Sequence, residues 1–252
     1  MNTMKTDILI IGAGPAGIFT ALELLRRGYK GHITMVEKGH RVEKRHCPKT
    51  ETGKCMNCKP YCHITTGFSG AGAFSDGKLS LSYEVGGDLP TLVGEELAQQ
   101  TIDYADGIYL EFGADTHVEG VSDPDRVKDI RLRAIGAGLK LVDCPIRHMG
   151  TEKAQEIYLG IEKYLEENGV ELIPENKVIS FTDDGVEIED RNWNHRILKA
   201  DTVVAAFGTV SNYPAVEHLS GLVPETYVVG DCGVPGNIKA ANTSAYLLAA
   251  RV

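Results

Sequence analysis

The 252-residue sequence has no apolar run long enough to cross a bilayer. Its longest runs, such as "ILII" and "VVAAF", fall far short of the roughly 20 residues that a membrane-spanning helix needs. No apolar segment followed by a small-residue cleavage site stands near its beginning, so we expect no secretion signal. Internal repeats, low-complexity tracts and long linkers are lacking too. These absences predict one continuous globular chain in the cytoplasm, where thiols stay reduced.

The chain also has fewer basic than acidic residues. The chain has 26 Lys and Arg against 35 Asp and Glu, which gives a net charge of -9. A nucleic acid or an anionic membrane would require a basic face, so we expect neither as a partner. The expected partners are a small-molecule substrate or a redox partner protein, and a second copy of the chain in a homo-oligomer.

Cysteine is rare except in one place. Four of the six cysteines, Cys47, Cys55, Cys58 and Cys62, lie within 16 residues. Four thiolates in one loop can bind zinc or an iron–sulfur cluster. Alternatively, Cys55 and Cys58 form a redox dithiol that exchanges electrons with a cofactor, or the cysteines stay reduced and have no special role. The spacing leaves all three interpretations open.

The strongest local pattern is "DILIIGAGPAGIFTALELLRRGYKGHITMVEKG". Residues 7–11 form a nearly continuous apolar run, typical of a strand buried on both faces of a parallel sheet. Gly12, Gly14 and Gly17 follow as G-x-G-x-x-G, then a helix, a second strand and Glu37, 20 residues beyond Gly17. This order predicts a dinucleotide-binding turn, with the diphosphate at the helix N-terminus and Glu37 on a ribose. The residues predicted to bind here are Gly12, Gly14, Pro15, Ala16, Gly17, Glu37 and Lys38.

The C-terminal segment "ETYVVGDCGVPGNIKAANTSAYLLAARV" predicts a strand, a Gly-Asp pair, a loop and a final helix. Together with the N-terminal motif, it resembles the last FAD-binding segment of the glutathione reductase-like superfamily of two-dinucleotide-binding flavoproteins. The resemblance implies that the Gly-Asp acid binds the ribityl chain or phosphate of FAD. It also implies that the following helix points its N-terminus at the flavin. The residues so implied are Gly208, Gly230, Asp231, Lys239, Ala240, Asn242 and Thr243.

Three further stretches, "CPKTETGKCMNCKPYC", "GFSGAGAFSDGKLSLS" and "PIRHMGTEK", resemble an uncharacterised family of FAD-dependent dehydrogenases. The last fifty residues are more similar to NADH:flavin oxidoreductases and enoate reductases. The dehydrogenase family carries a large substrate domain before its final FAD segment, but only "TVSNYPAVEHLSGLVP" stands there in this chain. The substrate region is therefore expected to be reduced.

The middle stretch "GFSGAGAFSDGKLSLS" is too rich in glycine for a packed element. By resemblance, Gly70, Ala71 and Gly72 line the flavin and Lys78 stabilises its reduced anion, with a solvated surface loop as the alternative. Arg147 and His148 offer carboxylate recognition and proton transfer, against a purely structural role.

A second Gly-x-Gly in "RAIGAGLKLV" does not predict a second nucleotide site. The preceding residues predict a helix with Asp123 as its N-cap and Gly138 at its end, and the strand follows the glycines instead of preceding them. NAD(P)H is therefore expected only as a transient donor, if it donates at all.

The remaining pattern completes the expected fold. An amphipathic helix begins with Thr151 as its N-cap and turns Ile157, Ile161, Tyr164 and Leu165 inward. Four short strands follow, "VELIP", "KVISFT", "DGVEIE" and "RILKA", and then a separate strand, "ADTVVAAFG". We expect an α/β, Rossmann-like, three-layer FAD-binding fold with a small β-meander and a reduced helical insert. Residues 1–85 and 170–252 form the FAD-binding domain, and residues 86–169 form the insert.

The expected function is that of an FAD-dependent oxidoreductase, a dehydrogenase or reductase that passes electrons between a donor and an acceptor. The alternative is a flavin-carrying electron-transfer or assembly module without its own substrate domain.

Overall fold

The computed structural model describes residues 3–211, 217–219, 222–236 and 238–251. These residues belong to two compact units, Met1–Ala206 and Phe207–Val252. We call them the first unit and the second unit and describe each by itself. None of the described helices combines the length and the apolar character needed to span a bilayer.

A six-stranded sheet organises the first unit, in the order β5-β2-β1-β8-β7-β6. Strands β5, β2, β1 and β8 run parallel, whereas β8, β7 and β6 form an antiparallel meander. The strands are β1 (Thr3–Ile11), β2 (Ile33–Val36), β5 (Val170–Ile173), β6 (Lys177–Thr182), β7 (Gly185–Glu189) and β8 (His195–Ala205). The expected Rossmann-like α/β fold with a meander is confirmed.

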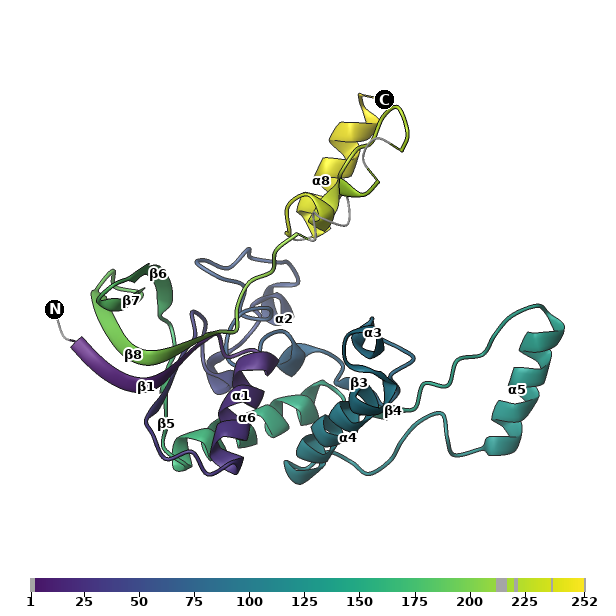
Figure 1. The fold of residues 1–252 in the computed structure, drawn as a ribbon, viewed down its shortest axis with the longest axis horizontal. Helices are drawn as coiled ribbons and strands as arrows, with labels where there is room; N and C mark the ends of the chain where they lie inside the picture. Colours follow the sequence, from purple (N-terminus) through teal and green to yellow (C-terminus); the bar gives the residue numbers. More distant parts are fainter. Residues whose placement is uncertain (1–2, 212–216, 220–221, 237, 252) are drawn as a thin grey trace. The chain divides into compact units, whose positions relative to one another are not determined.

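Strand β1 is buried on both faces, as its apolar run predicts. Ile10 packs with helices α1 (Pro15–Arg26) and α6 (Thr151–Glu167), which lie near each other in Figure 1. Leu9 and Ile11 pack on the opposite face against side chains of β7 and β8. Because β1 alternates between two apolar layers, its C-terminal end is held firmly under the glycine turn that follows.

A second, two-stranded sheet consists of β3 (Lys78–Ser80), at the end of the glycine-rich stretch, and β4 (Ile146–His148), in the insert. The prediction that the glycine-rich stretch contains no packed element is therefore wrong at its end, where Lys78 begins β3. Besides α6, the insert contains the helices α3 (Leu89–Val93), α4 (Glu95–Glu111) and α5 (Pro124–Gly136). A short α2 (Lys49–Thr52) lies in the cysteine segment.

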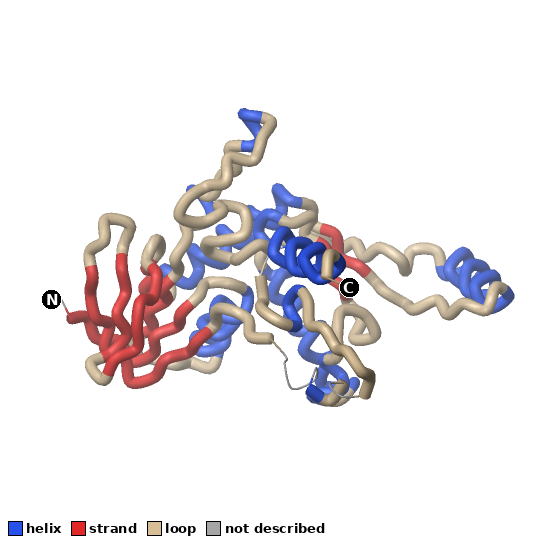
Figure 2. The backbone as a smooth tube through the Cα atoms, turned by 90° about the horizontal axis from the view of Figure 1, so that it is seen from above, coloured by secondary structure: helices blue, strands red, loops and turns tan. Residues whose placement is uncertain are grey.

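Helix α5 confirms the prediction that the second Gly-x-Gly follows a helix and does not open one. The Asp123 side chain accepts a hydrogen bond from the Arg126 backbone N–H at 3.0 Å, and Gly138 follows the helix with a φ of 73°. The glycines thus end a helix instead of opening one. In Figure 2 this helix stands away from the sheet, at the end of two extended segments.

Arg147 links three segments of the insert to one another. It is 4% exposed, and its guanidinium donates to both carboxylate oxygens of Asp106 at 2.5 and 2.7 Å and to the Asp115 carbonyl oxygen at 2.5 Å. The bond with Asp106 raises the pKa of Arg147 above its usual value. Strand β4, helix α4 and the loop after it are thereby joined through one side chain.

We predict that Arg147→Ala lowers the free energy of unfolding by about 3–5 kcal/mol, because Asp106 is left as a mostly buried, unpaired charge. The matched control is Arg131→Ala, which breaks an exposed pair with Asp143 and should cost at most about 1 kcal/mol. Urea denaturation measures both. Equal losses in the two variants would contradict this role of Arg147.

Candidate functional site

The candidate site is the turn between β1 and α1. Gly12 has a φ of 99°, a conformation that is strained for a residue with a side chain. Gly14 stands at the N-cap position of α1 and provides no side-chain hydrogen bond to the first turn. Pro15 occupies the first position of the helix. In an α-helix the first N–H groups have no partner within the helix, so this end is an uncapped, partly positive site suited to an anion.

The glycines of the turn differ in what surrounds them. A Cβ on Gly17 would overlap the carbonyl oxygen of Gly12, so the close packing of α1 on β1 requires glycine. A Cβ on Gly14 would meet nothing within 4 Å. Gly14 therefore leaves open space in front of the helix N-terminus, where a diphosphate is expected.

Glu37 lies at the end of β2 beside this turn. It is 7% exposed, and its carboxylate accepts hydrogen bonds from the backbone N–H groups of Ala13 at 3.0 Å and Gly39 at 2.9 Å. Each carboxylate oxygen can accept more than one hydrogen bond, so Glu37 keeps capacity for ribose hydroxyls. The structure holds this carboxylate next to the turn, where the sequence pattern predicts it.

Residues 67–72 lie against the same turn. The Ser69 N–H donates to the Ala13 carbonyl oxygen at 2.7 Å. A Cβ on Gly70 would lie 3.6 Å from the Gly14 Cα and the Pro15 Cδ. Gly72 begins a short 3-10 helix, Gly72–Phe74, beside the Tyr158 hydroxyl. Gly70, Ala71 and Gly72 are thus neighbours of the predicted diphosphate site, and their contact with a flavin stays a prediction.

Arg45 is a site residue that our sequence analysis missed, because it stands in an ordinary charged stretch. It is 5% exposed and donates to the carbonyl oxygens of His63, Ile64 and Phe68 at 2.8, 2.6 and 2.5 Å. Burial lowers its pKa to about 10. Through these three bonds Arg45 fixes the chain just before residues 67–72.

Lys78 and His148 are brought together across the β3–β4 ladder, in which they are direct partners. Both are exposed: Lys78 pairs with Asp76 at 2.9 Å, which raises the pKa of Lys78, and His148 lies 3.4 Å from Glu119. Arg147 occupies the next ladder position, so its side chain leaves the opposite face. Arg147 and His148, which were predicted for carboxylate recognition and proton transfer, therefore lie on opposite faces of the ladder.

The cysteine segment contains no disulfide, and all six cysteines are free. Across the described ranges, no three His, Cys, Asp or Glu side chains are grouped so that they could hold a metal ion. The zinc and iron–sulfur interpretations therefore gain no support. Burial opposes ionisation of the Cys62 thiol, but hydrogen bonds from Thr65 and Ile64 and the charge of Arg45 bring its pKa below the usual value.

The second unit holds the C-terminal residues. No strand precedes Gly230 in the described residues 222–229, so that prediction is wrong, whereas the final helix is confirmed as α8 (Ile238–Ala249). Gly230 has a φ of 62° and begins a 3-10 turn, Gly230–Cys232, and its N–H donates to the Ser244 hydroxyl at 2.9 Å. Asp231 accepts from the Gly236 N–H at 3.0 Å.

The other residues of the second unit that were predicted to bind FAD are Gly208 and four residues of α8. Gly208 has a φ of 76° in the segment after β8. Lys239, Ala240, Asn242 and Thr243 all belong to α8, in its first two turns, and the Lys239 side chain lies outside the described part. Their contact with a flavin stays a prediction.

Comparison with known proteins gives one match to a protein family. Residues 5–52 match the family described as FAD binding domain. This segment contains most of β1, the glycine turn, α1, β2, Glu37 and Arg45. The N-terminal segment is similar to an FAD-binding domain.

A stretch of 77 residues, 31% of this chain, is 42% identical to an uncharacterised protein of Clostridium beijerinckii and spans 14% of that protein. Among solved structures, a 3-ketosteroid-Δ4-(5α)-dehydrogenase from Rhodococcus jostii is 13% identical with a TM-score of 0.48, covering 98% of this chain and 53% of that one. A glycine oxidase from Geobacillus kaustophilus is 17% identical with a TM-score of 0.45, covering 81% and 56%. The chain thus spans little more than half the length of these structures.

We predict opposite effects for two substitutions in the glycine turn. Gly17→Ala should lower the free energy of unfolding by about 1–3 kcal/mol, because the new methyl overlaps a backbone oxygen. Gly14→Ala should leave stability nearly unchanged and weaken FAD binding roughly 10- to 100-fold, because its methyl occupies the space of the diphosphate. Thermal melts and FAD titration measure the pair. Wild-type FAD affinity in Gly14→Ala would contradict this placement of the diphosphate.

For Arg45 we predict that Arg45→Met lowers the free energy of unfolding by about 3 kcal/mol or more, since three carbonyl oxygens lose their donor while the apolar stem is kept. The control Arg27→Met removes an arginine that is 81% exposed and should cost at most about 1 kcal/mol. Urea denaturation gives both values, and limited proteolysis should cut residues 46–66 faster only in Arg45→Met. Unchanged stability and proteolysis in that variant would show that Arg45 does not hold the segment.

Proposed function

We propose that this protein is an FAD-dependent oxidoreductase that passes electrons between a donor and an acceptor through a bound flavin. The observation that carries the proposal is the uncapped N-terminus of α1, with open space at Gly14 and the Glu37 carboxylate beside it. These groups fit the diphosphate and a ribose of a dinucleotide. The match of residues 5–52 to the FAD binding domain family favours FAD as that dinucleotide.

The residues proposed to hold FAD come from three segments. Gly12, Gly14, Ala16 and Gly17 receive the diphosphate through backbone groups and the helix end, and Glu37 receives a ribose. Gly70, Ala71 and Gly72 lie against the turn, so their backbone is available along the bound cofactor. Gly230, Asp231 and the start of α8 belong to the second unit, and their contact with FAD stays a prediction from the resemblance.

When bound, the flavin supplies the chemistry by accepting or donating a hydride. The chain's own contribution is position and charge. Lys78 and His148, both exposed on one face of the β3–β4 ladder, are the residues we propose to handle charge and protons near the substrate. Arg147 binds Asp106 and thereby holds β4, the strand that carries His148. We therefore propose His148, and not Arg147, for proton transfer.

A second candidate function is a flavin-carrying electron-transfer module whose substrate domain is elsewhere. The short stretch of residues 209–224, which stands where the resembling dehydrogenase family carries its substrate domain, favours this candidate. In either case we propose a cytoplasmic protein, with NADH, NADPH, a small molecule or a redox partner protein as donor. Homo-oligomer formation also remains part of the proposal.

An anaerobic visible spectrum of the purified full chain, with iron and zinc analysis of the same sample, tests the proposal. We expect a resolved flavin spectrum at about one flavin per chain. Turnover of NADH or NADPH with an artificial acceptor would support the oxidoreductase. A bound flavin that light reduces but no donor reduces would support the module. A colourless protein that cannot be reconstituted with FAD would contradict both.

A further inference from the structure

Helix α5 lies at the end of an arm, residues 120–145, that leaves the insert where Glu119 and Ile146 exchange backbone hydrogen bonds at 2.8 and 3.1 Å. Figure 1 and Figure 2 both show the arm projecting from the rest of the insert. None of the 13 residues of α5 is buried. An isolated helix of this length is only marginally stable in water, because most helical stability in proteins comes from packing an apolar face. A helix such as α5 therefore needs a surface to cover it.

The side of α5 that faces solvent carries aliphatic residues. Arg131 belongs to a less exposed stripe of the helix and pairs with Asp143, in the arm's own connecting segment, at 2.5 Å. On the neighbouring stripe, Lys128, Leu132 and Ile135 follow one another at spacings of four and three residues. Leu132 is 60% exposed and Ile135 is 63% exposed. The arm thus presents an apolar stripe with a lysine at one end.

The charge of α5 is opposite to that of the whole chain. The helix has four Lys and Arg against two Asp, in a chain with a net charge of -9. Arg131 and Arg133 pair with aspartates of the arm. Arg126 and Lys128 have no ion-pair partner among the residues that the structure describes. These two unpaired cations beside an apolar stripe fit a surface that is both apolar and acidic.

A surface of that kind lies on the same chain, on helices α3 and α4, which contact each other and are joined by Gly94. Residues 79–119, which include both helices, contain nine Asp and Glu and no Lys or Arg. The most exposed apolar side chain here is Leu92, at 81%. What we call the α3–α4 patch consists of exposed residues only: Leu89, Leu92, Val93, Leu97, Glu95 and Glu96.

The acidic residues of the patch are available to a cation. Glu95 and Glu96 each accept a hydrogen bond from a neutral side chain at 3.3 Å, and neither has an ion pair within the described part of the chain. One contact between the arm and the acidic segment already exists, since Lys140 lies 3.7 Å from Glu84, ahead of α3. It attaches the base of the arm to its own chain, and α5 lies beyond it.

We propose that α5 of one copy docks on the α3–α4 patch of a second copy, and that the second copy returns the same contact. Leu132 and Ile135 cover the leucines of the patch, and Arg126 and Lys128 pair with its glutamates. The second copy is the partner because one chain carries both halves of the contact, each apolar and of opposite charge. A symmetric dimer uses each half twice and closes on itself. The inference gives the proposed homo-oligomer an interface and does not depend on flavin binding.

Size-exclusion chromatography with light scattering, run on a dilution series of the full chain, tests the proposal. We expect twice the mass of one chain for the wild type and the mass of one chain for the double variant Leu132→Asp/Ile135→Asp. The circular dichroism of that variant should match the wild type, because both side chains are exposed. A wild type that is monomeric throughout would overturn the proposal, and so would growth into assemblies larger than a dimer.

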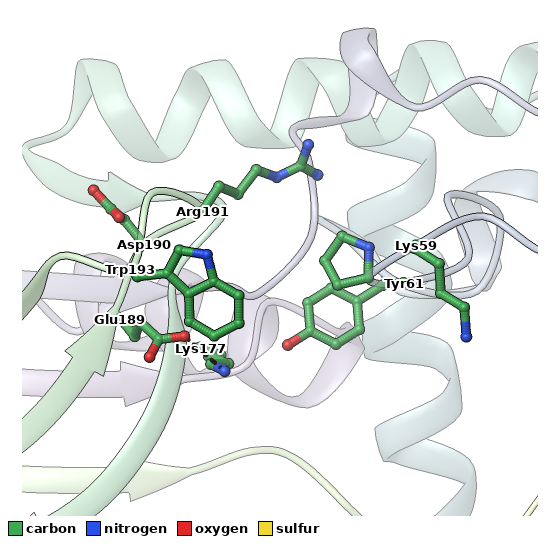
Figure 3. Close-up of a pocket in the computed structure, with 8 residues that line it drawn as sticks. Lys59, Tyr61, Lys177, Glu189, Asp190, Arg191 and Trp193 are labelled. Atoms are coloured by element: carbon green, nitrogen blue, oxygen red, sulfur yellow. Dashed lines mark ion pairs between the residues drawn. The ribbon is translucent and has the colours of Figure 1, made fainter.

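The matched control is Trp193→Gly. Trp193 is also a large exposed side chain, and it borders a pocket of about 370 Å³ opposite Tyr61 (Figure 3). None of the residues that line this pocket belongs to α3, α4 or α5. Glycine tolerates the φ of 63° at this position, so the variant should fold and remain a dimer. Loss of the dimer in this control would overturn the assignment of the interface to α5.

Charge reversal tests which surfaces meet. Arg126→Glu/Lys128→Glu places acidic residues on the arm, and Glu95→Lys/Glu96→Lys places basic residues on the patch. Each variant alone should dimerise at least about 10-fold more weakly than the wild type, because like charges then face each other. An equimolar mixture should form a heterodimer, since both of its contacts join opposite charges. Wild-type dimerisation of the separate variants, or a mixture that stays monomeric, would overturn the pairing of α5 with the α3–α4 patch.

The same samples separate this inference from the proposed function. A dimer that depends on α5 but binds no FAD would contradict the flavoprotein and leave the interface standing. A monomer that binds FAD would overturn the interface and leave the flavoprotein standing.

Discussion

The contact between Gly17 and the carbonyl oxygen of Gly12 is the constraint on which the site depends. Because a hydrogen atom is all that fits there, α1 packs directly on the end of β1 and its uncapped N-terminus lies over the turn. Strands β2 and β8 pair with β1 on either side, and β2 is fully buried, so the end of β1 is held in the sheet. Helix, turn and sheet edge therefore form one preorganised anion site instead of a flexible loop.

Two segments far away in sequence complete this site. Arg45 fixes residues 63–68 through three carbonyl oxygens, which places Gly70 against Gly14 and Pro15. The meander approaches Glu37 from the other side through the Asn176 backbone. The first unit thus offers adjoining places for a diphosphate and a ribose, and this combination supports a nucleotide more than an isolated phosphate.

The parts of the fold that depend on local pattern could be predicted from the sequence. The apolar run of β1 and the buried residues Ile157, Ile161 and Leu165 of α6 follow from periodicity, and the turn between β1 and α1 follows from its glycine motif. Element boundaries were less accurate: "RILKA" and "ADTVVA" form the single strand β8, and α6 is capped by Gly150, with Thr151 as its first residue. Backbone hydrogen bonds across the sheet decide those boundaries, and they connect residues far apart in sequence.

The walls of the candidate site were not predictable for the same reason. Nothing near Arg45 in sequence indicates that it will meet the carbonyl oxygen of Phe68, which lies 23 residues further along the chain. The strand expected before Gly230 failed because apolar composition does not form a strand without a neighbour to pair with. Conversely, the isolated pattern "PIRHMG" suggested a catalytic pair, but strand alternation turns Arg147 and His148 to opposite faces.

Hydrogen exchange of the full chain with and without FAD tests the central claim most directly, because it locates the bound cofactor on the backbone. The account predicts that FAD slows exchange of the amides at residues 12–17 and 67–72 and of those next to Glu37. Protection confined to other segments, or no change at residues 12–17 although FAD is bound, would contradict it.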